Sequence, residues 1–279
     1  MTPADFEFIS TVLHKRSGLV LTPEKIYLLE SRLTPLARRL GHASLQALIA
    51  AIRKSAPEDV LVEITEAMTT NESFFFRDKA PFEQFERLMI PTVRGANTGP
   101  LRVWCAAAST GQEPYSLSMV LSEKPALLGD QSIDILATDL SREVLERATK
   151  GVYTQFEVQR GLAVQMLIKY FEKTGDHWRI KPTIREMVRY KCLNLLHDFS
   201  DLGTFDIIFC RNVLIYFDRE TKTKVLNRLA AQLAPHGFLV LGAAETIFGL
   251  TDRFKPVNGE RGLYEAASAE RTMPLAAAG

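Results

Sequence analysis

Arg211 and Asn212 end an apolar run in the segment FDIIFCRNVLIYF, which covers residues 205–217. A strand that is buried on both faces offers no partner for a guanidinium, so this charge must lie where the strand leaves the sheet. In open α/β sheets, ligands bind along the edge formed by the carboxyl ends of the strands. The sequence therefore predicts that Arg211 and Asn212 belong to a binding site.

Small residues lie between a predicted strand and a predicted helix in VWCAAASTGQEPYS, residues 103–116. Such a segment lets the backbone approach a nucleotide closely. Only Gly111 remains of a G-x-G-x-x-G pattern, so the motif alone slightly favours a role in helix–strand packing. Asp139, which ends the next predicted strand, favours a nucleotide site, because an acid at this point can accept both ribose hydroxyls. Asp139 also suits the N-cap of the following helix, and the two roles are compatible.

The elements that must position these residues fall into two parts. Residues 2–87 have apolar side chains at helical spacing throughout, with helix starts predicted at Thr22, Ser44 and Pro57. After the segment NTGP, strands alternate with helices, which is typical of a parallel sheet built from β-α-β units. The segments HWRIKP and VRYKCLNL are predicted to be short strands of a small insertion.

The chain has 279 residues, of which 46% are hydrophobic, so it can form one large domain or two modest ones. We expect an all-α domain over residues 1–85, a linker over 86–99, and an α/β domain over 100–267 with an insertion at about 155–192. The Ala-rich residues 268–279 are expected to form a disordered tail.

Charge and cysteine usage exclude several classes of protein. The net charge of +1 gives no attraction of the whole molecule to nucleic acid or membrane. Cys105, Cys192 and Cys210 are widely spaced, which predicts buried thiols and neither disulfides nor a metal site. There is no apolar run of about 18 residues, and the N-terminus lacks the pattern of a signal peptide. We expect a cytoplasmic protein with no metal, no nucleic-acid partner and no membrane insertion.

Five blocks occur in order behind the helical region: TTNESFFFRD, AAASTGQEPYS, ATDLS, CLNLL and FDIIFCRNVLIYF. Over roughly residues 5–265 they resemble the CheR family of chemotaxis receptor methyltransferases. The resemblance implies an all-α N-terminal domain, then a Rossmann-like class I methyltransferase domain with a small antiparallel β-subdomain insertion. It also implies methyl transfer from S-adenosylmethionine to glutamate carboxylates on chemoreceptor signalling helices, with S-adenosylhomocysteine as the product.

The resemblance assigns roles around the cofactor. Arg77 would bind the methionine carboxylate and Glu113 the methionine amino group. Asp139 would bind the ribose, and Asn194 and Leu195 would contact the adenine. Without the resemblance, Arg77 would suit a surface ion pair, Glu113 a helix N-terminus and Asn194 a turn. The expected cofactor-binding residues are Asn71, Ser73, Arg77, Ala107, Gly111, Glu113, Asp139, Asn194, Leu195, Arg211 and Asn212.

The resemblance also makes Arg211 and Tyr216 the expected catalytic residues. A glutamate side chain has an ordinary pKa of about 4.3, so at neutral pH the substrate carboxylate is already a nucleophile and needs no general base. We expect Arg211 to anchor one carboxylate oxygen while the other attacks, and Tyr216 to keep the line of attack. Without the other motifs, Tyr216 would be interpreted as a core residue.

The helical segment LTPEKIYLLESRLTPLARRLG contains several cations, which by default form a solvated surface. In the CheR family the corresponding helix docks Glu-rich receptor helices, so we expect the docking residues to be Lys25, Arg32, Arg38 and Arg39. Some members also bind a receptor C-terminal pentapeptide through the inserted subdomain. The loop KTGDHW is short, so we do not expect such tethering here.

Two other functions would use parts of the same sequence. A nonenzymatic sensor or scaffold that binds S-adenosylmethionine would keep the fold, but Arg211 and Tyr216 argue against it. Methylation of nucleic acid or of a small molecule is disfavoured, because the chain has neither a base-flipping motif nor a broad basic surface. We expect a monomer that visits receptor arrays transiently.

Overall fold

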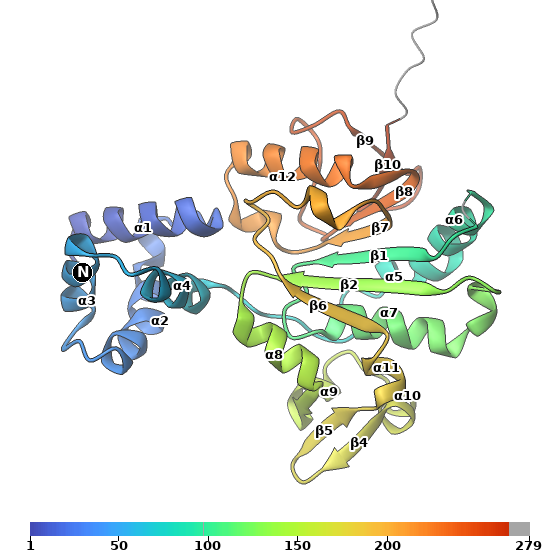
Figure 1. Ribbon diagram of the computed structural model, residues 1–279, viewed down its shortest axis with the longest axis horizontal. Coiled ribbons are helices and arrows are strands. Elements are labelled where there is room, and N and C mark those ends of the chain that lie inside the picture. Colours follow the sequence, from blue (N-terminus) through green and yellow to red (C-terminus); the bar gives the residue numbers. More distant parts are fainter. Residues whose placement is uncertain (97, 268–279) are drawn as a thin grey trace, which may run out of the picture.

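The computed structural model describes residues 1–96 and 98–267, and the tail expected at 268–279 lies outside the described residues. An all-α unit, called the helical unit, and an α/β unit lie side by side (Figure 1). They are joined by residues 69–79, the connecting segment, which has no regular secondary structure. The α/β unit contains a seven-stranded sheet and a separate three-stranded sheet. The fold class expected from the sequence is confirmed.

The helical unit consists of α1 (Pro3–Ser17), η1 (Pro23–Lys25), α2 (Ile26–Arg39), α3 (Leu45–Lys54) and α4 (Glu58–Met68). The Ser44 hydroxyl accepts a hydrogen bond from the N–H of Ala47 at 3.1 Å and caps α3, and Pro57 directly precedes α4. These two predicted helix starts are confirmed, whereas Thr22 precedes the short 3-10 helix η1. The four α-helices share one apolar core that includes Ile9, Leu13, Leu29, Leu33, Leu48 and Ile64.

Three further helical segments belong to the α/β unit: α5 (Ala80–Gln84), the π-helical η2 (Phe85–Met89) and α6 (Ile90–Ala96). Their apolar side chains join the core of the large sheet, and the ring of Phe85 lies 6.0 Å from that of Phe209. The predicted domain boundary at residue 85 and the predicted linker at 86–99 were therefore wrong. Helical periodicity alone does not tell which of two cores a helix joins.

The large sheet has the strand order β6-β2-β1-β7-β8-β10-β9. Its strands are β1 (Leu101–Ala106), β2 (Ile133–Asp139), β6 (Val188–Cys192), β7 (Phe205–Cys210), β8 (Leu233–Leu241), β9 (Phe254–Pro256) and β10 (Leu263–Ala266). The first five in this order are parallel, and β10 and β9 are antiparallel to their neighbours. Successive residues of β1 pack into cores on opposite faces, as expected for a strand that is covered on both sides.

The helices α7 (Gln112–Glu123), α8 (Arg142–Lys150) and α12 (Arg219–Ala231) flank this sheet (Figure 1). The connections of the sheet contain η3 (Pro125–Leu127), η4 (Ser200–Leu202) and η5 (Leu214–Tyr216). The insertion contains β3 (Val152–Thr154), α9 (Gln155–Gln159), α10 (Val164–Tyr170), β4 (Phe171–Thr174), β5 (His177–Ile180) and α11 (Pro182–Arg185). Its strands form an antiparallel sheet in the order β3-β5-β4. The strand predicted in HWRIKP is confirmed as β5.

The segment VRYKCLNL was wrongly assigned to the insertion. Its strand, β6, pairs in parallel with β2 at the edge of the large sheet, where Cys192 lies opposite Asp139. The Cys192 residue is exposed, so the expectation of three buried thiols holds only for Cys105 and Cys210. None of the helices in the described part of the chain is long and apolar enough to cross a bilayer.

Candidate functional site

A pocket lies between the two units at the carboxyl ends of β1, β2 and β7, with about 1070 Å³ of space that is partly open to solvent. It combines side chains from α1, from the connecting segment and from the loops of the large sheet. The expected cofactor-binding and catalytic residues that line it are Asn71, Ser73, Arg77, Ala107, Glu113, Asp139, Asn194, Leu195, Arg211, Asn212 and Tyr216.

Gly111 is the exception, since it does not line the pocket. It has φ of +91°, and an added Cβ would lie 2.7 Å from the Tyr190 hydroxyl and 3.0 Å from the Ala148 Cβ. The start of α7 thus packs too closely for a side chain. The structure supports the packing role that the motif alone favoured, and the cofactor-binding assignment of Gly111 stays a prediction.

The loop after β1 is held in an unusual conformation beside Asp139. Ala107 and Ser109 both have positive φ, which costs energy in a residue other than glycine unless its surroundings fix it. The N–H of Ser109 donates to the Asp139 carboxylate at 2.8 Å, and the Ser109 hydroxyl donates to the Asn71 carbonyl at 2.8 Å. One aspartate therefore shapes the loop and also lines the pocket.

Asp139 has a second structural contact at the start of α8. Its carboxylate accepts a hydrogen bond from the N–H of Ser141 at 3.0 Å, while the Ser141 hydroxyl caps the helix. Burial raises the pKa of the Asp139 carboxyl, and the backbone N–H groups oppose that rise. A carboxylate has about four acceptor positions, so these two bonds leave capacity for ribose hydroxyls.

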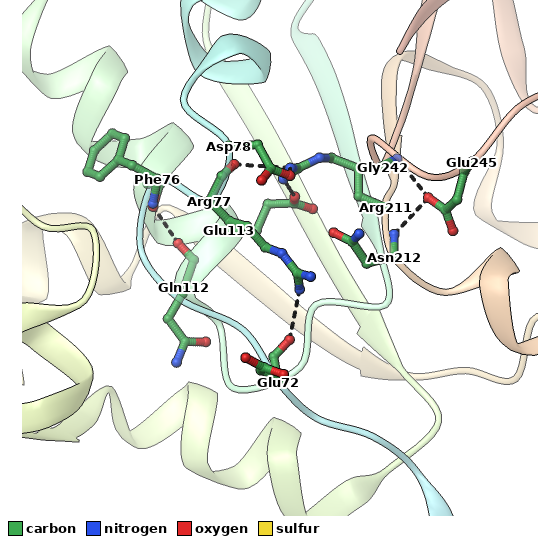
Figure 2. Close-up of polar contacts among 11 residues, drawn as sticks. Glu72, Phe76, Arg77, Asp78, Gln112, Glu113, Arg211, Asn212, Gly242 and Glu245 are labelled. Carbon is green, nitrogen blue, oxygen red and sulfur yellow. Dashed lines mark hydrogen bonds and ion pairs between the residues drawn. The ribbon is translucent and has the colours of Figure 1, made fainter. Parts of the chain in front are cut away.

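Arg211 has other partners than the sequence suggested. Its side chain is only 2% exposed, and its Nη1 donates to Glu113 Oε2 at 2.5 Å (Figure 2). Its Nη2 donates to Asp78 Oδ2 at 2.7 Å and to the Arg77 carbonyl at 3.0 Å. The guanidinium is thus engaged by two carboxylates of the chain itself, so these contacts do not support the expected anchoring of a substrate carboxylate, which stays a prediction. Arg211 fixes the connecting segment against β7.

Glu113 is held by its ion pair with Arg211, whereas Arg77 keeps donors for a ligand. Burial raises the pKa of the Glu113 carboxyl, and the Arg211 guanidinium opposes this rise. Arg77 donates only to the Glu72 carbonyl, at 3.0 Å, and forms no ion pair among the described residues (Figure 2). Because Arg77 is a half-buried cation on the pocket wall, it can donate hydrogen bonds to a carboxylate of a ligand.

Asn194 and Tyr216 connect the two units as well as lining the pocket. The Asn194 amide donates to the Arg16 carbonyl at 2.6 Å, and its oxygen accepts from the N–H of Leu196 at 3.0 Å. The turn role considered for Asn194 is therefore present. The Tyr216 carbonyl accepts a hydrogen bond from the N–H of Val20 at 2.9 Å.

Sequence reasoning missed several residues of the pocket wall. They come from the helical unit, the connecting segment and the strand ends: Ser17, Leu19, Met68, Thr69, Thr70, Glu72, Ser109, Thr138, Leu140, Leu193, Val213 and Phe217. Nothing in the sequence marks the residues of the helical unit as part of a site, because their approach to the sheet depends on how the two units pack. Glu245, which anchors the loop after β7, was also missed, although it lies shortly beyond the carboxyl end of the buried strand β8.

The four cations expected to dock a partner do not form one free surface. Arg32 donates to the carbonyls of Met68 and Thr69 at 2.8 and 3.0 Å and to the Thr70 hydroxyl at 3.2 Å. Arg32 therefore binds the C-terminal end of α4, and its docking role stays a prediction that these contacts do not support. Arg39 forms an ion pair with Glu63 at 2.6 Å, whereas Lys25 and Arg38 are exposed and form no ion pair among the described residues.

Replacing Arg32 with alanine should lower the free energy of unfolding by about 1–2 kcal/mol, because the carbonyls at the end of α4 lose their donor. Urea unfolding of the two proteins measures this difference. Arg38→Ala, on the same helix, is the matched control and should change stability by less than about 0.5 kcal/mol. Equal stability of all three proteins would contradict the role of Arg32.

Comparison with known proteins places this geometry in a family. The model for "CheR methyltransferase, SAM binding domain" matches residues 71–263, and that for "CheR methyltransferase, all-alpha domain" matches residues 4–69. The chain belongs to the CheR methyltransferase family. The division at residue 70 agrees with the boundary between the two apolar cores of this CheR-family chain.

Relatives match this CheR-family chain over nearly its whole length. A chemotaxis protein methyltransferase of Vibrio parahaemolyticus is 41% identical, with 94% of this chain and 97% of the relative covered. Chemotaxis protein methyltransferase 1 of Pseudomonas aeruginosa is 42% identical, with 95% and 98% covered. The chemotaxis protein methyltransferase of Escherichia coli is 34% identical, with 91% and 88% covered.

S-Adenosylmethionine is the cofactor of this CheR-family methyltransferase, and the pocket fits it. Arg77 offers a cation that has no ion-pair partner within residues 1–96 and 98–267, and Asp139 offers acceptor positions beyond its two backbone bonds. A polar ligand in this pocket would satisfy such groups.

Proposed function

We propose that this chain transfers the methyl group of S-adenosylmethionine to side-chain carboxylates of glutamates on chemoreceptors, forming methyl esters for sensory adaptation. The observation that carries the proposal is that Arg77, Asp139 and Tyr216 line one pocket of a CheR-family chain, and that none of the described residues lining it is a histidine. A pocket without such a base suits a nucleophile that is already ionised at neutral pH.

The cofactor, when bound, supplies a methyl group that is activated by its attachment to a sulfonium. The chain holds and orients the reactants: Arg77 binds the methionine carboxylate, Asp139 binds the ribose and Tyr216 keeps the substrate carboxylate in line. Correct orientation of two reactants can lower a barrier by about 7–11 kcal/mol. Leu19 and Met68 of the helical unit close the pocket on one side and help to exclude water.

Arg211 and Glu113 have supporting roles in this mechanism. Arg211 holds the connecting segment that carries Arg77, through the Arg77 carbonyl and the Asp78 carboxylate. It also holds the Glu113 carboxylate, which faces the pocket and can bind the amino group of the cofactor. The placement of both cofactor-binding side chains thus depends on one buried guanidinium.

The test is incubation of the protein with tritiated S-adenosylmethionine and purified receptor signalling domains. Base-labile radioactive methanol should be released from the receptor, as from a glutamate methyl ester. Cofactor binding without transfer to any receptor would favour the nonenzymatic sensor. Base-stable label would refute ester formation.

Electrostatic attraction should guide the substrate, which we take to be an acidic receptor helix. Reversing the two free cations, Lys25→Glu with Arg38→Glu, should raise the receptor KM by about 10-fold and leave cofactor affinity unchanged. The initial rate of the wild type should fall as ionic strength rises, and the rate of the variant should change less. The matched control reverses Lys54 and Lys173, which are exposed and form no ion pair among the described residues. Equal receptor KM in both double variants would contradict docking by Lys25 and Arg38.

A further inference from the structure

Glu245 lies in the segment that follows β8 and accepts four backbone hydrogen bonds. Its Oε2 accepts from the N–H groups of Asn212 and Gly242, both at 2.7 Å (Figure 2). Its Oε1 accepts from the N–H groups of Val213 and Leu214 at 2.9 and 2.7 Å. With 9% of the residue exposed, one carboxylate joins the ends of two neighbouring strands.

Local preference alone does not fix the loop that Glu245 holds. Asn212 has φ of +59°, a left-handed conformation that asparagine tolerates better than most residues with a side chain but that still needs support from its surroundings. Gly242 approaches so closely that an added Cβ would lie 2.7 Å from both Asn212 Nδ2 and Glu245 Oε2. Converging N–H groups of this kind need a negative charge among them.

The contacts of Glu245 exclude a direct chemical role. A carboxylate has about four acceptor positions, and here each oxygen already accepts two N–H groups. Glu245 is also absent from the pocket wall, whereas Asn212, Val213 and Tyr216 of the loop that it holds belong to the wall. Its influence on the pocket must therefore pass through this loop.

We infer that Glu245 is a positioning residue for methyl transfer, which fixes the loop 212–217 and thereby sets Asn212 and Tyr216 on the pocket wall. This inference rests on the proposed function. It assigns a role in the reaction to a side chain that touches neither cofactor nor substrate.

Glu245→Gln tests the inference while keeping the shape of the side chain. Because each carboxylate oxygen accepts two N–H groups, either orientation of the amide places an NH₂ group against two backbone donors. The variant must lose either the bonds to Asn212 and Gly242 or the bonds to Val213 and Leu214. Gly242→Ala is an independent test, because it crowds the same contact without changing any charge.

We expect kcat to fall at least about 10-fold in both variants, with the receptor KM within about 2-fold of wild type. The two amides that lose their acceptor, either those of Asn212 and Gly242 or those of Val213 and Leu214, should exchange hydrogen at least about 10-fold faster in Glu245→Gln. Glu265→Gln, in the same C-terminal part of the chain, has a side chain that is 42% exposed and paired with Lys255, and it should match the wild type.

Several outcomes would overturn the inference. Wild-type kcat in folded Glu245→Gln and Gly242→Ala would do so, and so would a lower melting temperature with unchanged activity per folded molecule. If the wild type methylates no receptor, the proposed function fails separately. Amide exchange and titration with S-adenosylhomocysteine then decide the positioning role: unchanged exchange and affinity in the variants refute it, and faster exchange with weaker binding supports it.

Discussion

Replacing Arg211 with alanine should destabilise the fold by about 3–5 kcal/mol, the usual cost of removing one partner from a buried ion pair. The Arg211 side chain is 2% exposed, and its loss leaves Glu113, at 12% exposed, without its counter-ion. Methyl transfer should fall below about 1% of the wild-type rate, because the connecting segment that carries Arg77 also loses its anchor. Urea unfolding and the tritium assay measure the two effects.

The stability deficit of Arg211→Ala should depend on pH. Burial raises the pKa of Glu113 above its ordinary value of 4.5, and Arg211 opposes that rise, so the variant should have the higher pKa. A carboxyl whose pKa is raised in the folded state stabilises the fold at low pH, where it is protonated. This stabilisation is lost as pH rises from the pKa of the unfolded state to the pKa of the folded state. The deficit should therefore be larger at pH 8 than at pH 5.

Arg189→Ala is the matched control for this experiment. Arg189 lies on β6 and forms an ion pair with Asp134 at 2.6 Å, with 62% of its side chain exposed. An exposed pair contributes about 0–1 kcal/mol, so the control should stay near wild type in stability and transfer. A deficit in Arg211→Ala that is no larger than that of the control would refute the anchoring role of Arg211.

The sequence predicted the residues of the site better than their contacts. Asp139 and Asn212 could be found because the carboxyl end of a buried parallel strand is recognisable from local pattern, and Glu245 follows the same rule. The partners of Arg211 could not be found in this way. Glu113 and Asp78 are 98 and 133 positions away in the chain, so their meeting depends on strand order and on the path of the connecting segment.

Other errors have the same cause, which is that local pattern does not specify tertiary packing. The strand β6 has the short apolar-polar pattern of an insertion strand, yet it extends the large sheet next to β2. Phe85 and Val93 lie at helical spacing, and only packing decides that they join the sheet core. Likewise, the exposed-face spacing of Arg32 does not show that the end of α4 lies within its reach.

Replacing Asp139 with alanine should weaken S-adenosylmethionine binding by about 1–3 kcal/mol, or about 5- to 150-fold, because the ribose hydroxyls lose a charged acceptor. The upper part of this range is expected. The same carboxylate also holds the N–H of Ser109, and the Ser109 hydroxyl holds the Asn71 carbonyl, so the loss reaches two further residues of the pocket wall.

Titration calorimetry with S-adenosylmethionine and S-adenosylhomocysteine should show similar losses for Asp139→Ala, since both ligands contain the ribose. Asp134→Ala is the control on the same strand: its side chain pairs with Arg102 and Arg189, and it does not line the pocket. The control should bind both ligands with wild-type affinity. Wild-type affinity of a folded Asp139→Ala protein would mean that Asp139 serves only the loop after β1 and the start of α8, and the ribose would then need another acceptor.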